Sequence, residues 1–282
     1  MDFSDNRLRS MHLFWDLPEN WCEEDYLKNI LDRVEVMLSK LNLTDRFIFI
    51  VTSVSDELPL THSERVVVIQ TSDESHEVPC FVDQAFLVFK NYKPFSIEPE
   101  NLRVIPLGYN KDVPNLKPKQ ILDRQFDIFF SGQTNYRGVF FKSLSEFKIS
   151  YPEWKMQVLK APGFRQGLSP ENYSNYLIDS KVALAPRGVS HETFRIYEAM
   201  RAGCVVIAER QLPTWFSHGW PIIEVDDWAN SGPLISALLS DSENLEAISL
   251  RTLRWWSEYC NEDAVARYIV KELTLKLIEG AS

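Results

Sequence analysis

The chain has 282 residues, 45% of them hydrophobic and 25% charged, a composition typical of a globular protein with one large or two ordinary domains. Its net charge of −10 argues against a broad nucleic-acid-binding surface, although a local pair of arginines could still bind an anionic ligand. The four cysteines form no CxxC pair, so we expect buried free thiols and no zinc site.

Neither a secretory signal nor a membrane-spanning segment is predicted. The first residues include Asp2 and Asp5 and lack the apolar stretch of a signal peptide. No run of about 18 apolar residues occurs anywhere in the chain. These features predict a cytoplasmic location, in which the thiols stay reduced.

The first 108 residues alternate short apolar runs with one strong helix. Asn20 is expected to cap this helix, with Glu23 completing a capping box three residues later. Apolar residues then recur every four positions from Tyr26 to Leu38 and give the helix one buried face. The expected strands are 11–15, 47–51, 66–69, 78–81, 85–89 and 104–107. This alternation predicts an α/β layer around a mostly parallel sheet.

A polar segment, 109–124, separates this half from a second α/β unit and is expected to be a linker or hinge. Ser169 is expected to cap one helix of the second unit, with Pro170 at the first helical position. The strands expected there are 126–130, 156–159 and 222–225, in addition to those of the central stretch described next. The expected helices are 139–147, 170–178, 234–239, 244–259 and 263–278.

The central stretch of the second unit, 180–208, reads as strand, loop, helix and strand. The strand 182–185 is broken by Pro186, Arg187 and Gly188, and a helix is expected over 191–202. Gly203 ends that helix before the buried strand 204–208. A loop that leads into a helix amino terminus, with arginines nearby, is suited to a phosphate group.

Three charged residues of this stretch, Glu192, Arg195 and Glu198, recur at intervals of three and are expected to share one helix face. A surface ion-pair ladder is the alternative, but the remaining residues are apolar and leave little solvated face. We therefore expect Arg187 and Arg195 to bind a diphosphate, and Glu198 to accept hydrogen bonds from ribose hydroxyls. Nearby donor-site candidates in the same loop are Ser190 and His191.

A second candidate donor segment comprises Ser131, Gly132, Asn135 and Arg137. Glycine allows the backbone to approach a phosphate closely and the arginine adds charge, although an ordinary turn explains these residues equally well.

The first half supplies the candidates for a general base: Asp16, Asp83 and His12. The two aspartates follow apolar runs, but a solvated loop carboxylate is the favoured interpretation of each, and a structural role is favoured for any histidine. No DxD triplet or His/Asp cluster supports a divalent-metal site.

Several runs resemble the exostosin-like glycosyltransferases, chiefly between about 89 and 207. These runs are LAPRG at 184–188, ETFRIYEA at 192–199, RAGCVVI at 201–207, FSGQTNYR at 130–137 and VIPLGY at 104–109. The resemblance implies a GT-B fold, with two Rossmann-like domains facing each other across a cleft. The expected parts are an acceptor-side domain 1–115, a donor-binding domain 116–262 and a terminal helix 263–282 that packs back on the first domain.

The same resemblance places Arg187 and Arg195 on the diphosphate of a nucleotide-sugar. Glu198 matches the second glutamate of a donor-binding pair, whereas the first falls on Ser190, which leaves the role of Glu192 open. The resemblance implies no cofactor, no bound metal and inversion at the anomeric carbon.

The expected function is transfer of a sugar to a hydroxyl of a glycan or lipid-linked glycan, as in polysaccharide biosynthesis. The expected partners exclude nucleic acid and leave room for peripheral membrane association. One alternative is a non-catalytic subunit that kept the donor pocket, and another is an unrelated two-domain sugar-binding or sugar-isomerising protein.

Overall fold

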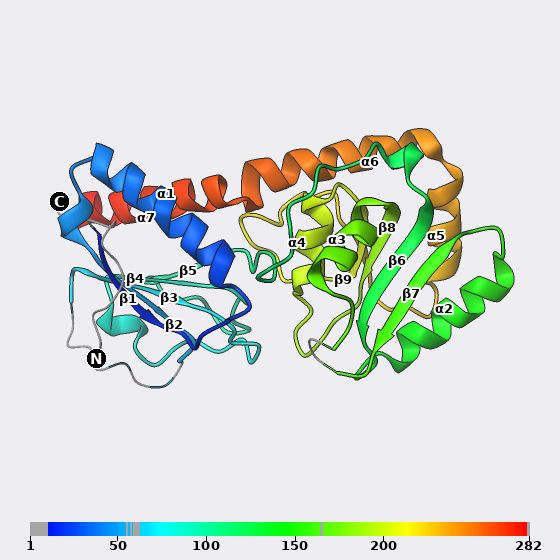
Figure 1. The fold of residues 1–282 in the computed structure, drawn as a ribbon. Coiled ribbons are helices and arrows are strands. Elements are labelled where there is room, and N and C mark those ends of the chain that lie inside the picture. Colours follow the sequence, from blue (N-terminus) through cyan, green and yellow to red (C-terminus); the bar gives the residue numbers. More distant parts are fainter. Residues whose placement is uncertain (1–10, 55, 57, 59–62, 164–165, 281–282) are drawn as a thin grey trace. The chain divides into compact units, whose positions relative to one another are not determined.

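The computed structural model describes residues 11–280 apart from positions 55, 57, 59–62 and 164–165. It contains two parallel sheets of five strands each, which are seen in Figure 1. The chain divides into two compact units. The first unit comprises the described residues up to 107 and from 261 onward, and the second comprises 108–260.

The sheet of the first unit runs in the order β1-β2-β3-β4-β5, with every neighbouring pair parallel. The apolar runs of β3 and β4 are buried along their full length, as expected for inner strands of a parallel sheet, whereas the edge strand β1 is partly exposed. The strands are β1 (His12–Asp16), β2 (Ile48–Thr52), β3 (Val66–Gln70), β4 (Leu87–Lys90) and β5 (Leu102–Val104). The parallel arrangement places all their carboxyl ends along one edge.

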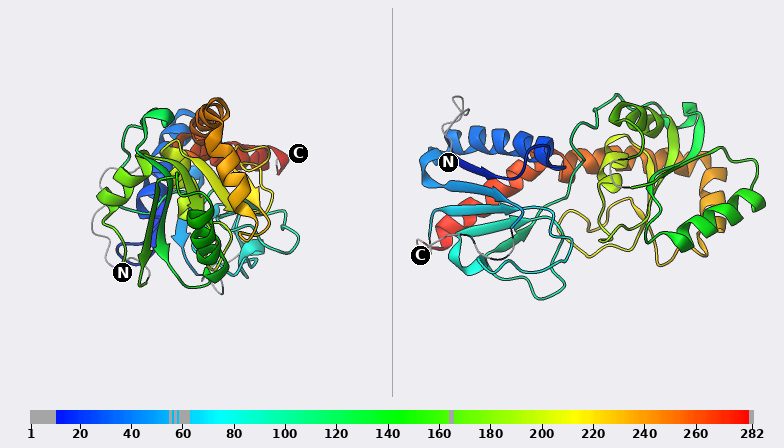
Figure 2. Two further views of the ribbon diagram at one scale, coloured as in Figure 1. Left: turned by 90° about the vertical axis from the view of Figure 1, so that its right-hand side faces the viewer. Right: turned by 60° about the horizontal axis from the view of Figure 1, so that its bottom comes forward.

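Two helices, α1 (Glu24–Lys40) and α7 (Glu262–Glu279), cover one face of this sheet, as Figures 1 and 2 show. The predicted apolar face of α1 is confirmed, because its residues from Tyr26 to Leu38 at four-residue spacing are fully buried. An ion pair of 2.8 Å between Arg33 Nε and Asp263 Oδ1 joins the two helices. Strand β5 is tied to α7 by a second pair, 2.6 Å long, between Arg103 Nε and Glu272 Oε2.

The predicted capping box of α1 is wrong. Asn20 has a left-handed backbone with φ of 61°, and Glu23 rather than Asn20 occupies the N-cap position. The Glu23 carboxylate does not turn back to the helix, because it accepts hydrogen bonds from the hydroxyls of Thr71 and Ser72 just beyond β3. A tertiary contact therefore replaces the local one.

The strand predicted at 78–81 is also wrong. This region is irregular and leads into a short 3₁₀ helix, η2 (Val82–Gln84). The loop is held by Lys90, whose fully buried ammonium group lies 2.8 Å from Asp73 Oδ2 and 2.6 Å from the carbonyl of Glu77. A charged anchor, rather than strand pairing, determines its course.

The sheet of the second unit has the order β10-β9-β8-β6-β7. Its strands are β6 (Phe126–Gln133), β7 (Met156–Ala161), β8 (Ser180–Ala185), β9 (Val205–Glu209) and β10 (Ile223–Val225). Strand β6 extends to Gln133, so Ser131 and Gly132 belong to the strand rather than to the loop predicted for them. After β7 has added to one side of β6, the chain returns to its other side as β8. The carboxyl ends of β6 and β8 therefore form a topological switch point, where parallel sheets commonly bind ligands.

The helices of this unit are α2 (Gly138–Ser150), α3 (Pro170–Ile178), α4 (Phe194–Arg201), α5 (Ser231–Ser240) and α6 (Ser242–Trp255). Short single turns of other helix types are η1 (Thr44–Arg46) in the first unit, and η3 (Ile121–Asp123) and the π-helix η4 (Trp256–Cys260) in the second. Ser169 caps α3 as predicted, because its Oγ accepts a hydrogen bond of 3.3 Å from the Asn172 N–H.

The helix predicted over 191–202 is shorter than expected. Thr193 has an extended backbone, with φ of −138°, so α4 begins only at Phe194. Both His191 and Glu192 lie in the preceding loop, which means that Glu192 does not share a helix face with Arg195 and Glu198. The helix ends as predicted at Gly203, whose φ of 68° favours glycine.

A buried arginine, Arg124, secures the opposite, amino-terminal edge of this sheet. It is 4% exposed and donates to the carbonyls of Ser180 at 2.8 Å, Ala202 at 2.7 Å and Lys119 at 3.0 Å. These bonds connect the starts of β6, β8 and β9. Removing the guanidinium group would leave three main-chain acceptors without this donor.

Replacing Arg124 by methionine is expected to lower the free energy of unfolding by about 3 kcal/mol or more, since buried acceptors lose charged donors. Urea denaturation would measure the change. The exposed Arg251 in α6 provides the matched control, and Arg251→Met is expected to have little effect. Equal losses in the two variants would contradict the anchoring role of Arg124.

Candidate functional site

Three arginines gather at the carboxyl ends of β6 and β8. Arg195, in the first turn of α4, donates from Nε to the carbonyl of Ser131 at 2.8 Å. Arg137 donates to the carbonyls of Arg187 at 2.9 Å and Gln133 at 2.7 Å. The Arg187 guanidinium group donates to the carbonyl of Val189 at 2.8 Å. Each arginine is therefore held by main-chain carbonyls, which position its positive charge without neutralising it.

Gly132 allows Arg195 to lie against β6. A Cβ atom at this position would be 2.2 Å from Nη2 of Arg195 and 3.2 Å from the Phe130 ring. The guanidinium carbon of Arg195 also lies 5.4 Å from the centre of that ring, within the range of a cation–π contact. The predicted close approach at Gly132 is thus made by an arginine of the protein itself.

Arg137 is the most buried of the three, at 3% exposed. Its pKa is lowered to about 10, mainly by burial and next by the positive charge of Arg195, while Glu209 opposes the change. The group remains charged at neutral pH. Burial and the neighbouring charge of Arg195 both disfavour the charged form, so a bound anion would stabilise it.

Glu209, the last residue of β9, supplies a carboxylate near the arginines. Its Oε1 accepts hydrogen bonds from the main-chain N–H of Arg187 at 3.3 Å and from Nε1 of Trp228 at 2.8 Å. Glu209 therefore orients the loop after β8. Sequence reasoning missed it, although its position directly after a buried strand on the same sheet edge was a usable signal.

The amino end of α4 contains an unpartnered hydroxyl. Thr193 precedes the helix with the backbone of an N-cap residue, yet its side chain makes no capping hydrogen bond. The residue is 8% exposed and its Oγ1 atom is buried without a partner. A buried hydroxyl normally has one, so this atom marks a place for a ligand or water. Sequence reasoning also missed Thr193, although Thr is a common N-cap residue.

The loop before α4 holds three predicted donor-site residues. Ser190 is buried, and its Oγ accepts a hydrogen bond of 3.1 Å from the Glu192 N–H. The Glu192 carboxylate accepts a hydrogen bond from the Tyr197 hydroxyl. Nδ1 of His191 lies 3.0 Å from the carbonyl of Arg210, which turns the ring toward the segment after β9. All three shape the loop in the structure, and their contact with a donor remains a prediction.

Glu198 is buried in the middle of α4, at 4% exposed. One carboxylate oxygen accepts a hydrogen bond of 3.1 Å from the Asn110 N–H, and the other accepts one of 2.7 Å from the Tyr173 hydroxyl. Burial, followed by the negative charge of Glu198, raises the pKa of Tyr173 well above its usual value, so Tyr173 remains a donor. Glu198 therefore ties the start of the second unit to α3 and α4. Its predicted bond to a ribose remains untested.

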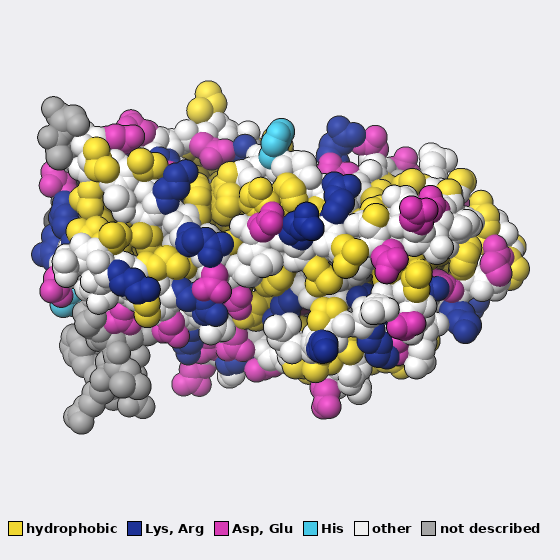
Figure 3. Space-filling view, turned by 90° about the horizontal axis from the view of Figure 1, so that it is seen from above, with side chains coloured by type: hydrophobic (Ala, Val, Ile, Leu, Met, Phe, Trp, Pro, Cys, Tyr) yellow, Lys and Arg dark blue, Asp and Glu magenta, His cyan; other side chains and the backbone are white. Residues whose placement is uncertain are grey.

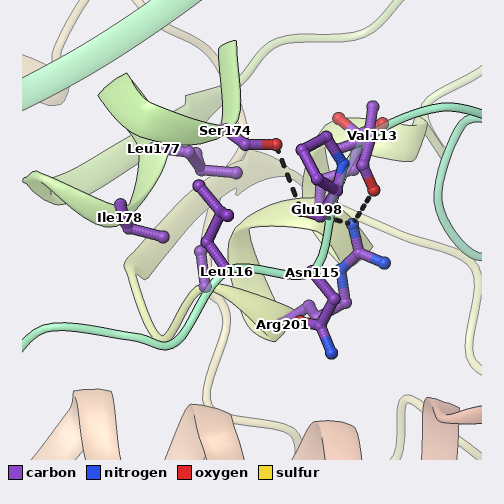
Figure 4. Close-up of a pocket in the computed structure, with 10 residues that line it drawn as sticks. Val113, Asn115, Leu116, Ser174, Leu177, Ile178, Glu198 and Arg201 are labelled. Carbon is purple, nitrogen blue, oxygen red and sulfur yellow. Dashed lines mark hydrogen bonds between the residues drawn. The ribbon is translucent and has the colours of Figure 1, made fainter. Parts of the chain in front are cut away.

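A small pocket lies beside Glu198, between the segment 113–116 and helices α3 and α4 (Figure 4). Arg201 donates to the carbonyl of Val113 at 2.6 Å, and Ser174 donates to the carbonyl of Pro114 at 3.2 Å. These bonds reinforce those of Glu198. The predicted linker is thereby fastened to the second unit over this part of its length.

The three candidate general bases lie at different edges of the first sheet. His12 starts β1 and Asp16 ends it, about 13 Å apart at ~3.3 Å per residue. Asp83 lies in η2 before the amino end of β4, on the same edge as His12. Asp16 is therefore the one of the three at the carboxyl edge, where its exposed carboxylate accepts a hydrogen bond of 3.0 Å from Thr52.

Among the residues that the structure describes, no group of three His, Cys, Asp or Glu side chains could hold a metal ion. Within the same residues, none of the helices is long and apolar enough to cross a membrane.

Residues 156–262 match the family model of the RXYLT1 C-terminal domain, which belongs to the exostosin-like family. No curated protein matches the chain in sequence. The match covers α4 and the loop before it, so the predicted resemblance is confirmed there.

Several solved structures share the fold. An alpha-glucosyltransferase in complex with UDP has a TM-score of 0.52 at 12% identity, over 94% of this chain and 99% of its own. Anabaena Alr3699/HepE, in complex with UDP and glucose, has a TM-score of 0.52 at 13% identity, over 94% and 99%. AviGT4, a glycosyltransferase of avilamycin A biosynthesis, has a TM-score of 0.52 at 11% identity, over 95% and 98%. The predicted GT-B fold is confirmed.

The exclusion of nucleic acid as a partner is wrong. An alpha-glucosyltransferase in complex with UDP-glucose and DNA containing an abasic site also has a TM-score of 0.52 to this chain, at 12% identity, over 94% of this chain and 99% of its own. Net charge sums the entire surface and does not determine what one region of it binds. On the face of this protein shown in Figure 3, described side chains of both charges are interspersed.

The arginine cluster and the loop before α4 thus lie on the GT-B fold shared with solved glycosyltransferases, and residues 156–262 match the family model of the RXYLT1 C-terminal domain.

Proposed function

We propose that this protein is a glycosyltransferase that moves a sugar from a nucleoside diphosphate donor to a hydroxyl of a glycan or lipid-linked glycan. One observation carries the proposal: Arg137, Arg187 and Arg195 meet at the switch point and are held by carbonyls rather than carboxylates. Their positive charge is therefore available to an anion. A diphosphate at the carboxyl ends of β6 and β8 would match both this charge and this position.

The chemistry of transfer explains why such charge is useful. When the bond between the sugar and the diphosphate breaks, negative charge develops on the leaving group. Half-buried guanidinium groups stabilise that charge more strongly than they stabilise the neutral bond, which lowers the barrier. The amino end of α4 and the unpartnered Thr193 hydroxyl would add to the same effect. The guanidinium groups and the helix terminus would supply positive charge, and the hydroxyl would supply a hydrogen-bond donor.

Uridine diphosphate is the nucleotide that we propose first, because structures of the same fold contain UDP. Inversion at the anomeric carbon follows if the acceptor hydroxyl attacks opposite the leaving diphosphate in a single step. Such attack requires a group that takes the proton of the acceptor hydroxyl.

A thermal-shift series with UDP, GDP, ADP, TDP and CMP tests donor binding. At about 100 times its dissociation constant, the correct nucleotide is expected to stabilise the protein by roughly 2.7 kcal/mol. UDP is expected to give the largest shift. No shift with any nucleoside diphosphate would contradict the proposed function, while binding without release of UDP from any UDP-sugar would indicate a non-catalytic subunit.

Replacing Arg187 or Arg195 by alanine is expected to weaken UDP binding at least tenfold and to slow UDP release from a UDP-sugar by about 100-fold. The reason is that each variant removes a positive charge from the leaving group. Calorimetry and a coupled UDP assay would measure the two effects. Arg267→Ala, at an exposed position of α7, provides the control. Unchanged turnover in both site variants would refute the assignment.

The glycines near β6 offer a matched pair that leaves every charge in place. Gly132→Ala is expected to displace Arg195, because the new Cβ would lie 2.2 Å from its guanidinium group, and to weaken UDP binding about tenfold. Gly138→Ala, where a Cβ meets nothing within 4 Å at the start of α2, is expected to preserve binding. Isothermal calorimetry with UDP would compare the two, and equal affinities would contradict the role of Gly132.

A further inference from the structure

Four buried polar side-chain atoms in the described part of the chain have no hydrogen-bond partner. They are Trp21 Nε1, Glu23 Oε2, Gln70 Oε1 and Thr193 Oγ1. The first three belong to one region, since Trp21 and Glu23 lie between β1 and α1 and Gln70 ends β3. All three therefore lie at or beyond the carboxyl edge of the first sheet. Unpartnered buried groups are uncommon, and their concentration at one edge calls for an explanation.

Glu23 is the charged member of this group. It is fully buried, and both of its described hydrogen bonds converge on Oε1, from the hydroxyls of Thr71, at 2.7 Å, and Ser72. Asn91 supports both partners, since its Nδ2 donates to Thr71 Oγ1 at 2.9 Å and its Oδ1 accepts from the Ser72 N–H at 3.0 Å. A network of side chains from β1–α1, β3–β4 and β4–β5 thus directs one carboxylate oxygen toward Ser72.

Ser72 connects the buried carboxylate to the surface. The residue is partly exposed and has a left-handed backbone, with φ of 63°. Non-glycine residues seldom adopt this conformation unless their surroundings hold them there. Here the Asn91 amide holds the main chain while the hydroxyl donates to Glu23. A serine in this position has one side toward solvent and the other toward a carboxylate.

The electrostatics of Glu23 suit a proton acceptor. Burial raises its pKa above the usual range, although hydrogen bonds from Ser72, Thr71, its own main chain and Asn91 counteract this. The nearby acid Glu74 also has a raised pKa, first through burial and then through Glu23, while a hydrogen bond with Tyr92 lowers it. Lys90 is paired with Asp73, so its charge is balanced locally.

We propose that Ser72 and Glu23 form the proton relay that activates the acceptor hydroxyl, an assignment that rests on the proposed function. The acceptor hydroxyl gives its proton to Ser72 Oγ as the Ser72 proton passes to Glu23 Oε1. The acceptor oxygen then bonds to the anomeric carbon, and the electron pair of the broken bond leaves with the nucleoside diphosphate. Ser72 would contact the acceptor, and Glu23 would act through Ser72.

The relay explains features that Asp16 does not. Asp16 also lies at the carboxyl edge but is exposed to solvent. Glu23 is desolvated and bound to a hydroxyl. The remaining unpartnered atoms fit the same class of ligand, because the Trp21 N–H needs an acceptor and the Gln70 oxygen needs a donor, and a sugar hydroxyl can provide either.

The test uses the full chain and two substitutions of different kinds. Glu23→Gln preserves the size and the acceptor oxygen but removes the basic carboxylate. Ser72→Gly removes the hydroxyl, and glycine suits the left-handed backbone at this position, so the main-chain conformation is expected to be kept. Each is expected to slow UDP release from UDP-sugars by about 100-fold or more, with UDP affinity unchanged. Glu77→Gln is the control, because it removes one negative charge from an exposed position in the same loop and is expected to leave turnover unchanged.

The pH profile separates a relay from a merely structural role. Glu23 must be ionised to accept a proton, so kcat/KM of the parent is expected to fall as pH drops through the raised pKa of Glu23. Glu74→Gln removes a negative charge next to Glu23. Without that charge the Glu23 carboxylate is more stable, so the fall in kcat/KM is expected to move to lower pH. Glu23→Gln is expected to abolish the limb.

Turnover by Glu23→Gln and Ser72→Gly equal to that of Glu77→Gln would overturn the relay and leave the proposed function intact. Loss of turnover only in Asp16→Asn would likewise overturn it and assign the base to Asp16. A parent protein that binds no nucleoside diphosphate, or that releases no UDP from any UDP-sugar, would overturn the proposed function and the relay together.

Discussion

The hydrogen bond from Arg195 to the carbonyl of Ser131 joins the first turn of α4 to the end of β6, and the rest of the site depends on it. The two elements meet because β7 adds to one side of β6 and β8 adds to the other, which reverses the order of the strands at this point. Gly132 allows the contact, since any side chain there would occupy the space of the guanidinium group. Arg137 then closes the arrangement by binding the carbonyl of Arg187.

Positive charge at this edge is held in place without being neutralised. Carbonyl oxygens satisfy the donors of the arginines, while the one carboxylate shown to act on Arg137, Glu209, is occupied with the Arg187 N–H and the Trp228 indole. The pKa of Arg137 is lowered mainly by burial and next by the positive charge of Arg195. The proposed diphosphate would meet charge already held in place, which is the condition for strong electrostatic stabilisation of a developing charge.

The first unit presents the opposite electrostatic situation at the same edge of its own sheet. There Glu23 is a buried carboxylate with hydroxyl partners on one oxygen and none on the other. The second sheet therefore carries surplus positive charge at its carboxyl edge, and the first carries a desolvated carboxylate at its own. This difference between the two edges follows from which side chains come directly after the strands.

Local patterns in the sequence determined most elements, because apolar runs and helical spacing report directly on burial. They located both helices of the first unit, the capped start of α3 at Ser169 and the arginines after the central strands. The helix predicted from His191 began instead at Phe194, and Glu23 formed no capping box, since contacts distant in sequence won over local propensity. Only the tertiary structure brought Arg137 to Arg187 and Glu23 to Ser72, because strand order in a parallel sheet, which spacing along the chain does not encode, decides which loops become neighbours.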